Sequence, residues 1–359
     1  MNNKTSNEDH KKVTSRREFI ASMSSLAIGC GLGQKAAFAA QNLPPLPTTA
    51  FNHMTIAVSD PSASIDWYQG LFGMPIVARQ RDTIVLRVGE GPQFIAISGS
   101  PSSDPRITHY CLSIDDFDYE EAVRILADHG VAAENSSGPM QSRVRMRGPE
   151  FGGAPSGTPE LYFGDPDGIV VQLQDSSYCG GAGLNGEQCL DTEETASTEG
   201  LLTIREFNHF TLFVSDQARS IQFYQSLFGM PVDTFQGALP VMRVGLGRAF
   251  LALAQPPAPP GIHHVSLAVN NFDVDRIFSV LEDYGLTILG EAGRASGPLQ
   301  AYVTMRGANR GGLLTGTPEV YFTDPDGILL QLQDNRYCGG NGYFGELCGT
   351  VENPTGRNL

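Results

Sequence analysis

The chain has 359 residues and a formal net charge of −15, with 24 lysines and arginines against 39 acidic residues. Because nucleic-acid binding depends on clustered basic side chains that neutralise phosphates, this balance excludes nucleic acid as the expected partner. The 41 glycines, the 23 prolines and the short apolar runs indicate many turns and short strands. Without its N-terminal segment the chain keeps about 320 residues, enough for two domains.

Residues 1–40 have the features of a twin-arginine export signal. Arg16 and Arg17 precede a short run of small and apolar residues, and residues 37–39 offer a signal-peptidase site. The run is shorter than the roughly 20 apolar residues of a membrane span. We therefore expect a periplasmic or secreted protein that is exported folded and is not inserted in a membrane after cleavage. A lipid anchor at Cys30, in a weak lipobox-like context, is the alternative.

The first half of the remaining chain reads as two successive modules of strand, helix and further strands. Residues 51–58 alternate as a strand, Asp60 offers a helix cap, and apolar residues at helical spacing follow until Gly73. The pattern then restarts with a second strand and helix. The further elements expected in chain order are strands 84–88, 93–98 and 107–114, a helix at 119–129, and strands 142–147, 159–163 and 169–174.

The second half repeats the first. FNHMTIAVSD (51–60) matches FNHFTLFVSD (207–216), and GTPELYFGDPDGIVVQLQD (157–175) matches GTPEVYFTDPDGILLQLQD (316–334). A whole domain therefore occurs twice, and the chain holds four β-α-β-β-β modules. The expected divisions are the signal 1–40, a first domain 41–190 with modules 51–98 and 107–175, an acidic linker 191–204, a second domain 205–348 with modules 206–254 and 262–334, and a tail 349–359.

Four of the six cysteines occur in matched pairs behind the two copies. Cys179 and Cys189, like Cys338 and Cys348, enclose glycine-rich loops (178–189 and 337–348). In an oxidising compartment this spacing predicts two local disulfides; a copper or zinc site at these thiols is the less favoured interpretation. Cys111 lies in an apolar strand, where a free thiol behaves as a small hydrophobic side chain.

These motifs resemble the vicinal oxygen chelate superfamily, which includes glyoxalase I, bleomycin-resistance proteins and extradiol dioxygenases. The resemblance rests on module-opening strands with a histidine, on helices that end in LFGMP (71–75 and 227–231), and on the DPDG turn before a last strand. It covers about 51–175 and 206–334. It implies an α+β fold in which the four βαβββ modules pair into two tandem glyoxalase-like cupped sheets, each with a metal at its centre.

In this superfamily the metal ligands come from the first strand of each module and from the last strand of the pair. Alternation along 51–58 places the histidine on the face opposite Met54, Ile56 and Val58. Four of the chain's seven histidines occupy matched opening positions. The implied ligands are His53, His109 and Gln172 in the first domain and His209, His264 and Gln331 in the second.

The glutamines depart from the family's glutamate. Two imidazoles and a carboxylate form the facial triad that holds non-haem Fe(II) with open positions. An amide ligates more weakly and leaves one more positive charge at the site, which favours an anionic substrate or lowers the pKa of a bound hydroxyl group. Fe(II) is the first expectation, with Mn, Cu or Zn as alternatives; a metal-free cup in which the glutamine only donates and accepts hydrogen bonds also remains open.

Three further pairs are candidates for a place near the substrate. Tyr162 and Tyr321 stand ten residues before the glutamines, as a site-facing tyrosine does in extradiol dioxygenases. Glu160 and Glu319, on the same strand face as these tyrosines, are candidates for a group beside the ligands or a general base, or for edge residues. Arg147 and Arg306 could clamp a carboxylate or enolate, or be surface cations.

The functional expectation is a metal-dependent dioxygenase that acts on a small, vicinally oxygenated substrate, as a monomer or homodimer. The histidine that serves as acid–base group in extradiol dioxygenases is replaced by Gly153 and Gly312. A glyoxalase-like lyase or isomerase is less well supported, because strands 93–98 and 249–254 share no polar residue that could be a fourth ligand. The competing class is a metal-free binding protein of the bleomycin-resistance type.

Overall fold

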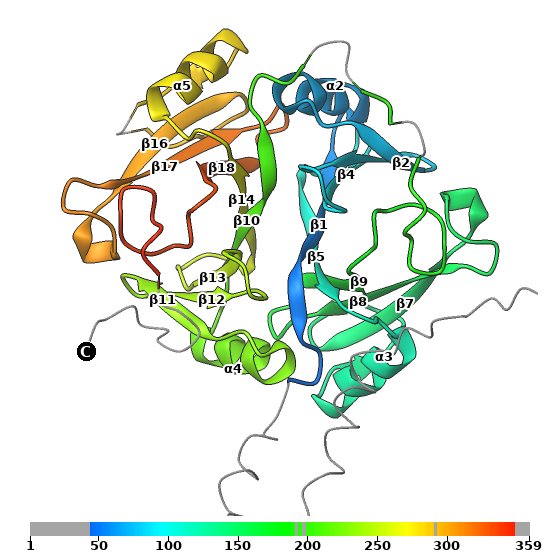
Figure 1. Ribbon diagram of the computed structural model, residues 1–359. Coiled ribbons are helices and arrows are strands. Elements are labelled where there is room, and N and C mark those ends of the chain that lie inside the picture. Colours follow the sequence, from blue (N-terminus) through cyan, green and yellow to red (C-terminus); the bar gives the residue numbers. More distant parts are fainter. Residues whose placement is uncertain (1–43, 191–192, 196–198, 291–292, 349–359) are drawn as a thin grey trace, which may run out of the picture. The chain divides into compact units, whose positions relative to one another are not determined.

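A computed structural model describes residues 44–190, 193–195, 199–290 and 293–348 (Figure 1). These residues belong to one compact unit, Leu43–Leu359. The expected export signal and the tail 349–359 lie outside the described residues. Among those that are described, no helix is long and apolar enough to cross a membrane.

The first half forms one mixed sheet of nine strands in the order β2-β3-β4-β1-β5-β9-β8-β7-β6. At its centre β1 runs antiparallel to β5, and β5 runs parallel to β9. Its strands are β1 (Thr48–Val58), β2 (Ile76–Gln80), β3 (Thr83–Arg87), β4 (Phe94–Gly99), β5 (Arg106–Ile114), β6 (Ala132–Ala133), β7 (Gln141–Arg147), β8 (Thr158–Gly164) and β9 (Val170–Asp175); its helices are α2 (Pro61–Phe72), α3 (Tyr119–Asp128) and the short 3-10 turn η1 (Pro149–Phe151).

The second half repeats this sheet in the order β11-β12-β13-β10-β14-β18-β17-β16-β15. Its strands are β10 (Ile204–Phe213), β11 (Val232–Gln236), β12 (Leu239–Arg243), β13 (Phe250–Ala254), β14 (Gly261–Val269), β15 (Thr287–Ile288), β16 (Gln300–Arg306), β17 (Thr317–Thr323) and β18 (Leu329–Asp334); its helices are α4 (Gln217–Phe228), α5 (Val274–Asp283) and the 3-10 turn η2 (Ala308–Arg310). The predicted fold of four modules in two tandem cupped sheets is confirmed. Strands β2 and β6 and their repeats β11 and β15 were not among the strands expected individually.

Local sequence explains the first helix of each half. The Asp60 side chain accepts the N–H of Ala63 at the start of α2, and Gly73 ends the helix in the left-handed conformation (φ 68°). A residue with a Cβ is strained at that φ, whereas glycine is not. Asp216 and Gly229 cap α4 in the same way, so the repeated SD…LFG pattern fixes the same helix twice.

The outer faces of the two sheets and their helices share one hydrophobic core. Met54, Ile56 and Val58 of β1 are fully buried in it, as the strand alternation predicted. Each first helix packs against the other half: the Trp67 ring of α2 lies 6.1 Å from Phe322 of β17. Burial of these apolar faces is the main stabilising contribution to the fold.

The two DPDG turns also bind the first helix of the opposite half. Tyr68 of α2 donates its hydroxyl to Oδ2 of Asp324 (3.1 Å), and Tyr224 of α4 donates to Oδ2 of Asp165 (2.9 Å). The other oxygen of Asp165 accepts the backbone N–H groups of Asp167 and Ile169 inside its own turn. The repeated aspartate therefore shapes the turn and anchors a helix from the opposite half.

Candidate functional site

The sheets β1–β9 and β10–β18 are called the first and the second cup. Three adjacent strands bring the predicted ligands of the first cup together. His53 lies on β1, His109 on β5 and Gln172 on β9, and these strands are neighbours at the centre of the sheet. Nε2 of each histidine lies 3.1 Å from Oε1 of Gln172. Three atoms that can ligate a metal therefore converge on one point.

Asn52 sets the tautomer of His53. The Asn52 amide donates from Nδ2 to the carbonyl oxygen of Tyr178 (2.8 Å), so its oxygen faces Nδ1 of His53, 2.7 Å away. An amide oxygen only accepts, and Nδ1 must therefore carry the proton. Burial, with the positive charge of a protonated His109 as a smaller cause, holds the pKa of His53 well below its usual value. The ring is thus neutral, and its Nε2 presents a lone pair.

Thr108 does the same for His109. The Thr108 hydroxyl donates to the carbonyl oxygen of Thr55 (3.1 Å), and its oxygen lies 3.0 Å from Nδ1 of His109. Since the hydroxyl has one hydrogen, it accepts from Nδ1, and Nε2 is again left with its lone pair. Burial lowers the pKa of His109 to about 4.

The second cup has the same predicted ligands, but the Nδ1 atom of its second histidine, His264, has a different hydrogen-bonding neighbour. Asn208 orients His209 as Asn52 orients His53: its Nδ2 donates to the carbonyl oxygen of Tyr337 and its oxygen lies 2.8 Å from Nδ1. Burial lowers the pKa of His209 to about 3. His264 places Nε2 2.8 Å from Oε1 of Gln331, while its Nδ1 meets Nδ1 of His263 at 2.7 Å, where the first cup has a threonine hydroxyl.

The donor set of the first cup fits a divalent metal. In the first cup two imidazole lone pairs and an amide oxygen face one another with no hydrogen between them, an arrangement that a cation stabilises. Within the described residues no cluster of three or more His, Cys, Asp or Glu could hold a metal, because the third ligand here is an amide. The Nε2 atoms of Gln172 and Gln331 are buried and have no hydrogen-bond partner in the described part of the chain.

The predicted glutamate, tyrosine and arginine of the first cup form one buried cluster beside these ligands. Glu160 accepts from Nε of Arg147 (2.7 Å), from the Tyr162 hydroxyl (3.1 Å) and from the Tyr178 hydroxyl (3.0 Å). The Tyr162 ring meets His109 edge-on, with centroids 5.3 Å apart. Burial raises the pKa of Tyr162 well above its usual value, and the charge of Glu160 adds to this. Tyr162 is therefore a neutral phenol whose ring lines one side of the site.

Arg147 is placed to hold structure. Its side chain is fully buried, and its other two nitrogens donate to the carbonyl oxygens of Phe151 and Gly181. A substrate clamp at Arg147 would require these bonds to break. The second cup repeats the cluster with Glu319, Tyr321, Tyr337 and Arg306, whose three nitrogens donate to Glu319, Arg310 and Gly340.

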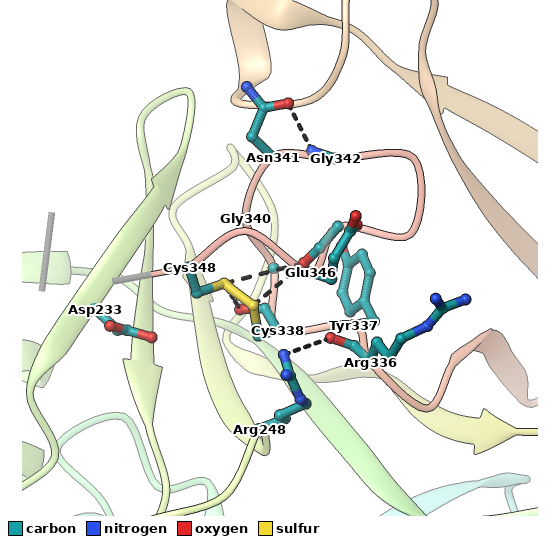
Figure 2. The surroundings of a disulfide bond; sticks show 12 residues. Asp233, Arg248, Arg336, Tyr337, Cys338, Gly340, Asn341, Gly342, Glu346 and Cys348 are labelled. Atoms are coloured by element: carbon teal, nitrogen blue, oxygen red, sulfur yellow. Dashed lines mark hydrogen bonds between the residues drawn. A yellow bond between two sulfur atoms is a disulfide. The ribbon is translucent and has the colours of Figure 1, made fainter. Parts of the chain in front are cut away.

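The predicted disulfides are present and their loops lie inside the cups. Cys179 bonds to Cys189 and Cys338 to Cys348. In Figure 1 the red segment after β18 lies within the curve of its sheet, and Figure 2 shows its disulfide beside Tyr337. Gly339 has a φ of 83°, where a side chain is strained, and its added Cβ would come within 3.2 Å of Phe250 of β13, so the loop backbone lies close against the sheet. The loops were predicted, but their place over the ligands was not.

The loop of the first cup leaves one side of the ligand set accessible. Tyr178 and Phe94 cover His53, with ring centroids 5.6 Å and 4.3 Å away, and His53 and Gln172 are almost fully buried. His109 is partly exposed. The solvent-accessible side of this centre is therefore that of His109.

Six polar residues of the site were not among the predicted ones: Thr108 and His263, which differ between the halves, and the four repeated residues Asn52, Asn208, Tyr178 and Tyr337. Each of the four repeated residues occurs at a matched position, in the shared FNH and YCGG sequences, and that recurrence was the signal that could have identified them.

Comparisons with known proteins identify the family of the chain. The family model described as the Glyoxalase/Bleomycin resistance protein/Dioxygenase superfamily matches residues 50–173 and 206–332. No curated protein matches the chain significantly.

Solved structures with the same fold include a Mn(II)-bound glyoxalase from Novosphingobium aromaticivorans (17% identity, 80% of this chain and 82% of that chain, TM-score 0.53). Another is a catechol 2,3-dioxygenase (15% identity, 82% and 88%, TM-score 0.53). A third is homoprotocatechuate 2,3-dioxygenase from Brevibacterium fuscum in complex with 3,4-dihydroxyphenylacetate (15% identity, 81% and 82%, TM-score 0.55). At these identities the likeness concerns the fold.

Proposed function

Because the chain belongs to the Glyoxalase/Bleomycin resistance protein/Dioxygenase superfamily, we propose that it is a metal-dependent enzyme acting on a small substrate with two vicinal oxygens, most like the dioxygenase branch. The observation that carries the proposal is the convergence of two neutral imidazoles and an amide oxygen in the first cup, with both tautomers set by neighbouring side chains. The proposed ligands are His53, His109 and Gln172, and His209, His264 and Gln331.

A divalent metal at these ligands, Fe(II) in the first instance and Mn, Cu or Zn as alternatives, would polarise substrate oxygens and lower the pKa of a substrate hydroxyl group. With an amide in place of a carboxylate, the protein contributes no negative charge through its three ligands. The centre therefore keeps the full charge of the ion and favours a substrate that binds as an anion.

The remaining residues of each cup position the ligands and keep water away. Asn52 and Thr108 hold the lone pairs of His53 and His109 toward the centre. Glu160 holds the Tyr162 hydroxyl away from the metal ligands, so the apolar edge of the ring faces His109. The disulfide loop covers the side of His53, which directs the substrate to the side of His109.

A metal-free binding protein is the second candidate, and one feature favours it. In the opposite orientation of its amide, Gln172 would point Nε2 toward the Nε2 atoms of both histidines and could donate one hydrogen to each. A glutamate could not do so. The glutamine is therefore compatible with a cup that is stable without metal.

We also propose that the protein acts in the periplasm or outside the cell after export by the twin-arginine route. The two disulfides support this address, because such bonds persist in oxidising compartments.

Metal analysis of the mature protein, purified without chelators or an affinity tag, tests the enzyme proposal. We expect about two equivalents of metal per chain, about one after His53→Ala or His209→Ala, and essentially none in the double variant. His129→Gln is the matched control, because His129 lies at the end of α3, where its Nδ1 donates to the carbonyl oxygen of Ile125. If no metal is retained even after reconstitution, the enzyme proposal fails and the binding protein is left.

A further inference from the structure

The two cups share their innermost residues but differ on one wall, which is formed by β7 in the first cup and β16 in the second. Strand β7 carries Arg143 and Arg145 where β16 carries Tyr302 and Thr304. Each strand pairs with the strand that carries the tyrosine beside the second histidine of its cup, Tyr162 beside His109 and Tyr321 beside His264. The difference therefore falls on the part of the cup that a substrate meets beyond the metal ligands.

In the first cup this wall is cationic. The Arg143 guanidinium lies over the Tyr162 ring, 4.5 Å from its centroid, and that ring contacts His109. Arg145 places Nη1 3.6 Å from Glu160, the same carboxylate that already binds Arg147. Two guanidinium groups thus share one carboxylate while a third, that of Arg143, lies over the neighbouring ring, and Arg143 and Arg145 are both partly exposed. The excess positive charge faces the entrance.

In the second cup the same wall is aromatic. Tyr302 stacks on Tyr321, with centroids 5.0 Å apart and planes at 11°. His263 stacks on Phe213 at 4.3 Å and lies against His264. Thr304 donates a neutral hydrogen bond to Glu319 where the first cup has a guanidinium.

Besides the buried Arg306, which is paired with Glu319, the cations that act on this second wall are Arg294 and Arg310. Both act electrostatically on residues of the cup, Arg294 on His263 and Tyr302 and Arg310 on Tyr321. Both are exposed, and water screens exposed charges strongly. Neither lies over an aromatic ring of the wall as Arg143 does.

We propose that the two cups select different substrates: the first takes an aromatic ligand that carries a carboxylate beside its vicinal oxygens, and the second takes an uncharged aromatic ligand. Arg143 and Tyr302 are the residues that determine this specificity. Arg143 is placed to bind the carboxylate, whereas Tyr302, buried in a stack on Tyr321, presents no charge to a ligand and leaves an aromatic wall. The inference rests on the proposed function to the extent that the vicinal oxygens bind a metal.

The test compares two probes, 3,4-dihydroxybenzoate and catechol, on full-length chains in which one cup is disabled. The His209→Ala chain reports on the first cup and the His53→Ala chain on the second. Dissociation constants come from titration calorimetry without oxygen, and metal content is measured on the same samples. We expect the first cup to prefer the carboxylated probe and the second to prefer catechol, each on the order of tenfold, as one partly screened charge pair provides.

Exchanging the two residues should exchange the preferences. Arg143→Tyr in the first cup should abolish its preference for the carboxylated probe, and Tyr302→Arg should create one in the second. Arg124→Tyr, on the exposed face of α3, is the matched control and should change neither constant.

The possible outcomes distinguish a failure of this specificity inference from a failure of the proposed metal-dependent function. Metal in both cups with equal probe ratios, or with no binding of either probe, overturns the inference and leaves the metal centres standing. Cups that hold no metal but still show opposite preferences overturn the proposed enzyme and support the inference. Opposite preferences that survive both exchange variants overturn the assignment to Arg143 and Tyr302.

Discussion

Replacement of Asp165 by asparagine should change how the stability of the protein depends on pH. Burial raises the pKa of Asp165 from 3.8 to about 6, against the opposing effect of the hydrogen bonds that it accepts from Ile169, Tyr224 and Asp167. The folded state therefore binds a proton that the unfolded state releases between these two values. A difference of about 2 pH units corresponds to about 3 kcal/mol.

The sign follows from the raised pKa. Asp165 contributes its full stability below pH 3.8, where it is protonated in both states, and the contribution is lost as the pH rises to 6 and above. The asparagine of the variant has no such titration, and its side-chain oxygen still accepts the turn's backbone N–H groups. Its amide can donate to Tyr224, whose hydroxyl can then donate to Tyr110, 2.9 Å away. The hydrogen-bond chain is kept.

The assay is urea unfolding of the wild type and Asp165→Asn at intervals from pH 4 to pH 8. The quantity of interest is the variant's free energy of unfolding minus that of the wild type, because the buried histidines titrate in the same range in both proteins. We expect this difference to rise by about 3 kcal/mol between pH 4 and pH 7. Parallel profiles for the two proteins would refute the argument that burial of this carboxylate dominates its titration.

Three other perturbations test the site and its supports. Asn52→Ala should weaken metal binding at the first cup by about 10- to 100-fold, because the tautomer of its histidine is no longer held, while the second cup keeps its affinity in metal titrations. Replacing Cys179 and Cys189 together by serine should lower the free energy of unfolding by about 2 to 3 kcal/mol in urea under non-reducing conditions; a change below about 0.5 kcal/mol would contradict a stabilising role for the loop. Arg147→Met should cost about 3 to 5 kcal/mol by leaving a buried carboxylate unpaired, whereas Arg124→Met, which breaks exposed ion pairs, should change thermal unfolding little.

The meeting of His53, His109 and Gln172 could be predicted because it depends on regular features. His53 shares a strand face with Thr55 and Ala57, and its opposite face is the buried apolar one. The module order then makes the histidine strands and the glutamine strand neighbours. Strand alternation and repeat register carry this information in the sequence.

Asn52 escaped prediction because the strand is irregular where it lies. Simple alternation points adjacent residues to opposite faces, so Asn52 and His53 should not meet. The pairing of β1 with β5 shifts register between Phe51 and Met54, and β10 shifts at the matching place between Phe207 and His209. Such a bulge redirects a side chain, and a single sequence gives little sign of it.

The role of Arg147 depended on tertiary placement that spacing does not reveal. Arg143, Arg145 and Arg147 alternate along β7 and face the same side of the sheet, yet the last is fully buried and the first two are partly exposed. The disulfide loop accounts for this difference, because it lies over Arg147 and its Gly181 carbonyl oxygen accepts a hydrogen bond from that guanidinium. The cysteine spacing predicted a closed loop but not the surface on which it rests.

The exchange of helices between the halves bears on how far the two cups are independent. Asp165 accepts its hydrogen bond from Tyr224 of the second half, and Asp324 accepts from Tyr68 of the first. Either half alone would expose the apolar face of its first helix and leave a buried carboxylate turn without its phenol. The halves should therefore unfold as one cooperative unit. Their ligand sets share no residue, so metal binding at one cup should leave the affinity of the other unchanged to first order. Duplication of the segment thus gives one folding unit with two separately tunable sites, and that separation lets the entrance residues of the two cups differ.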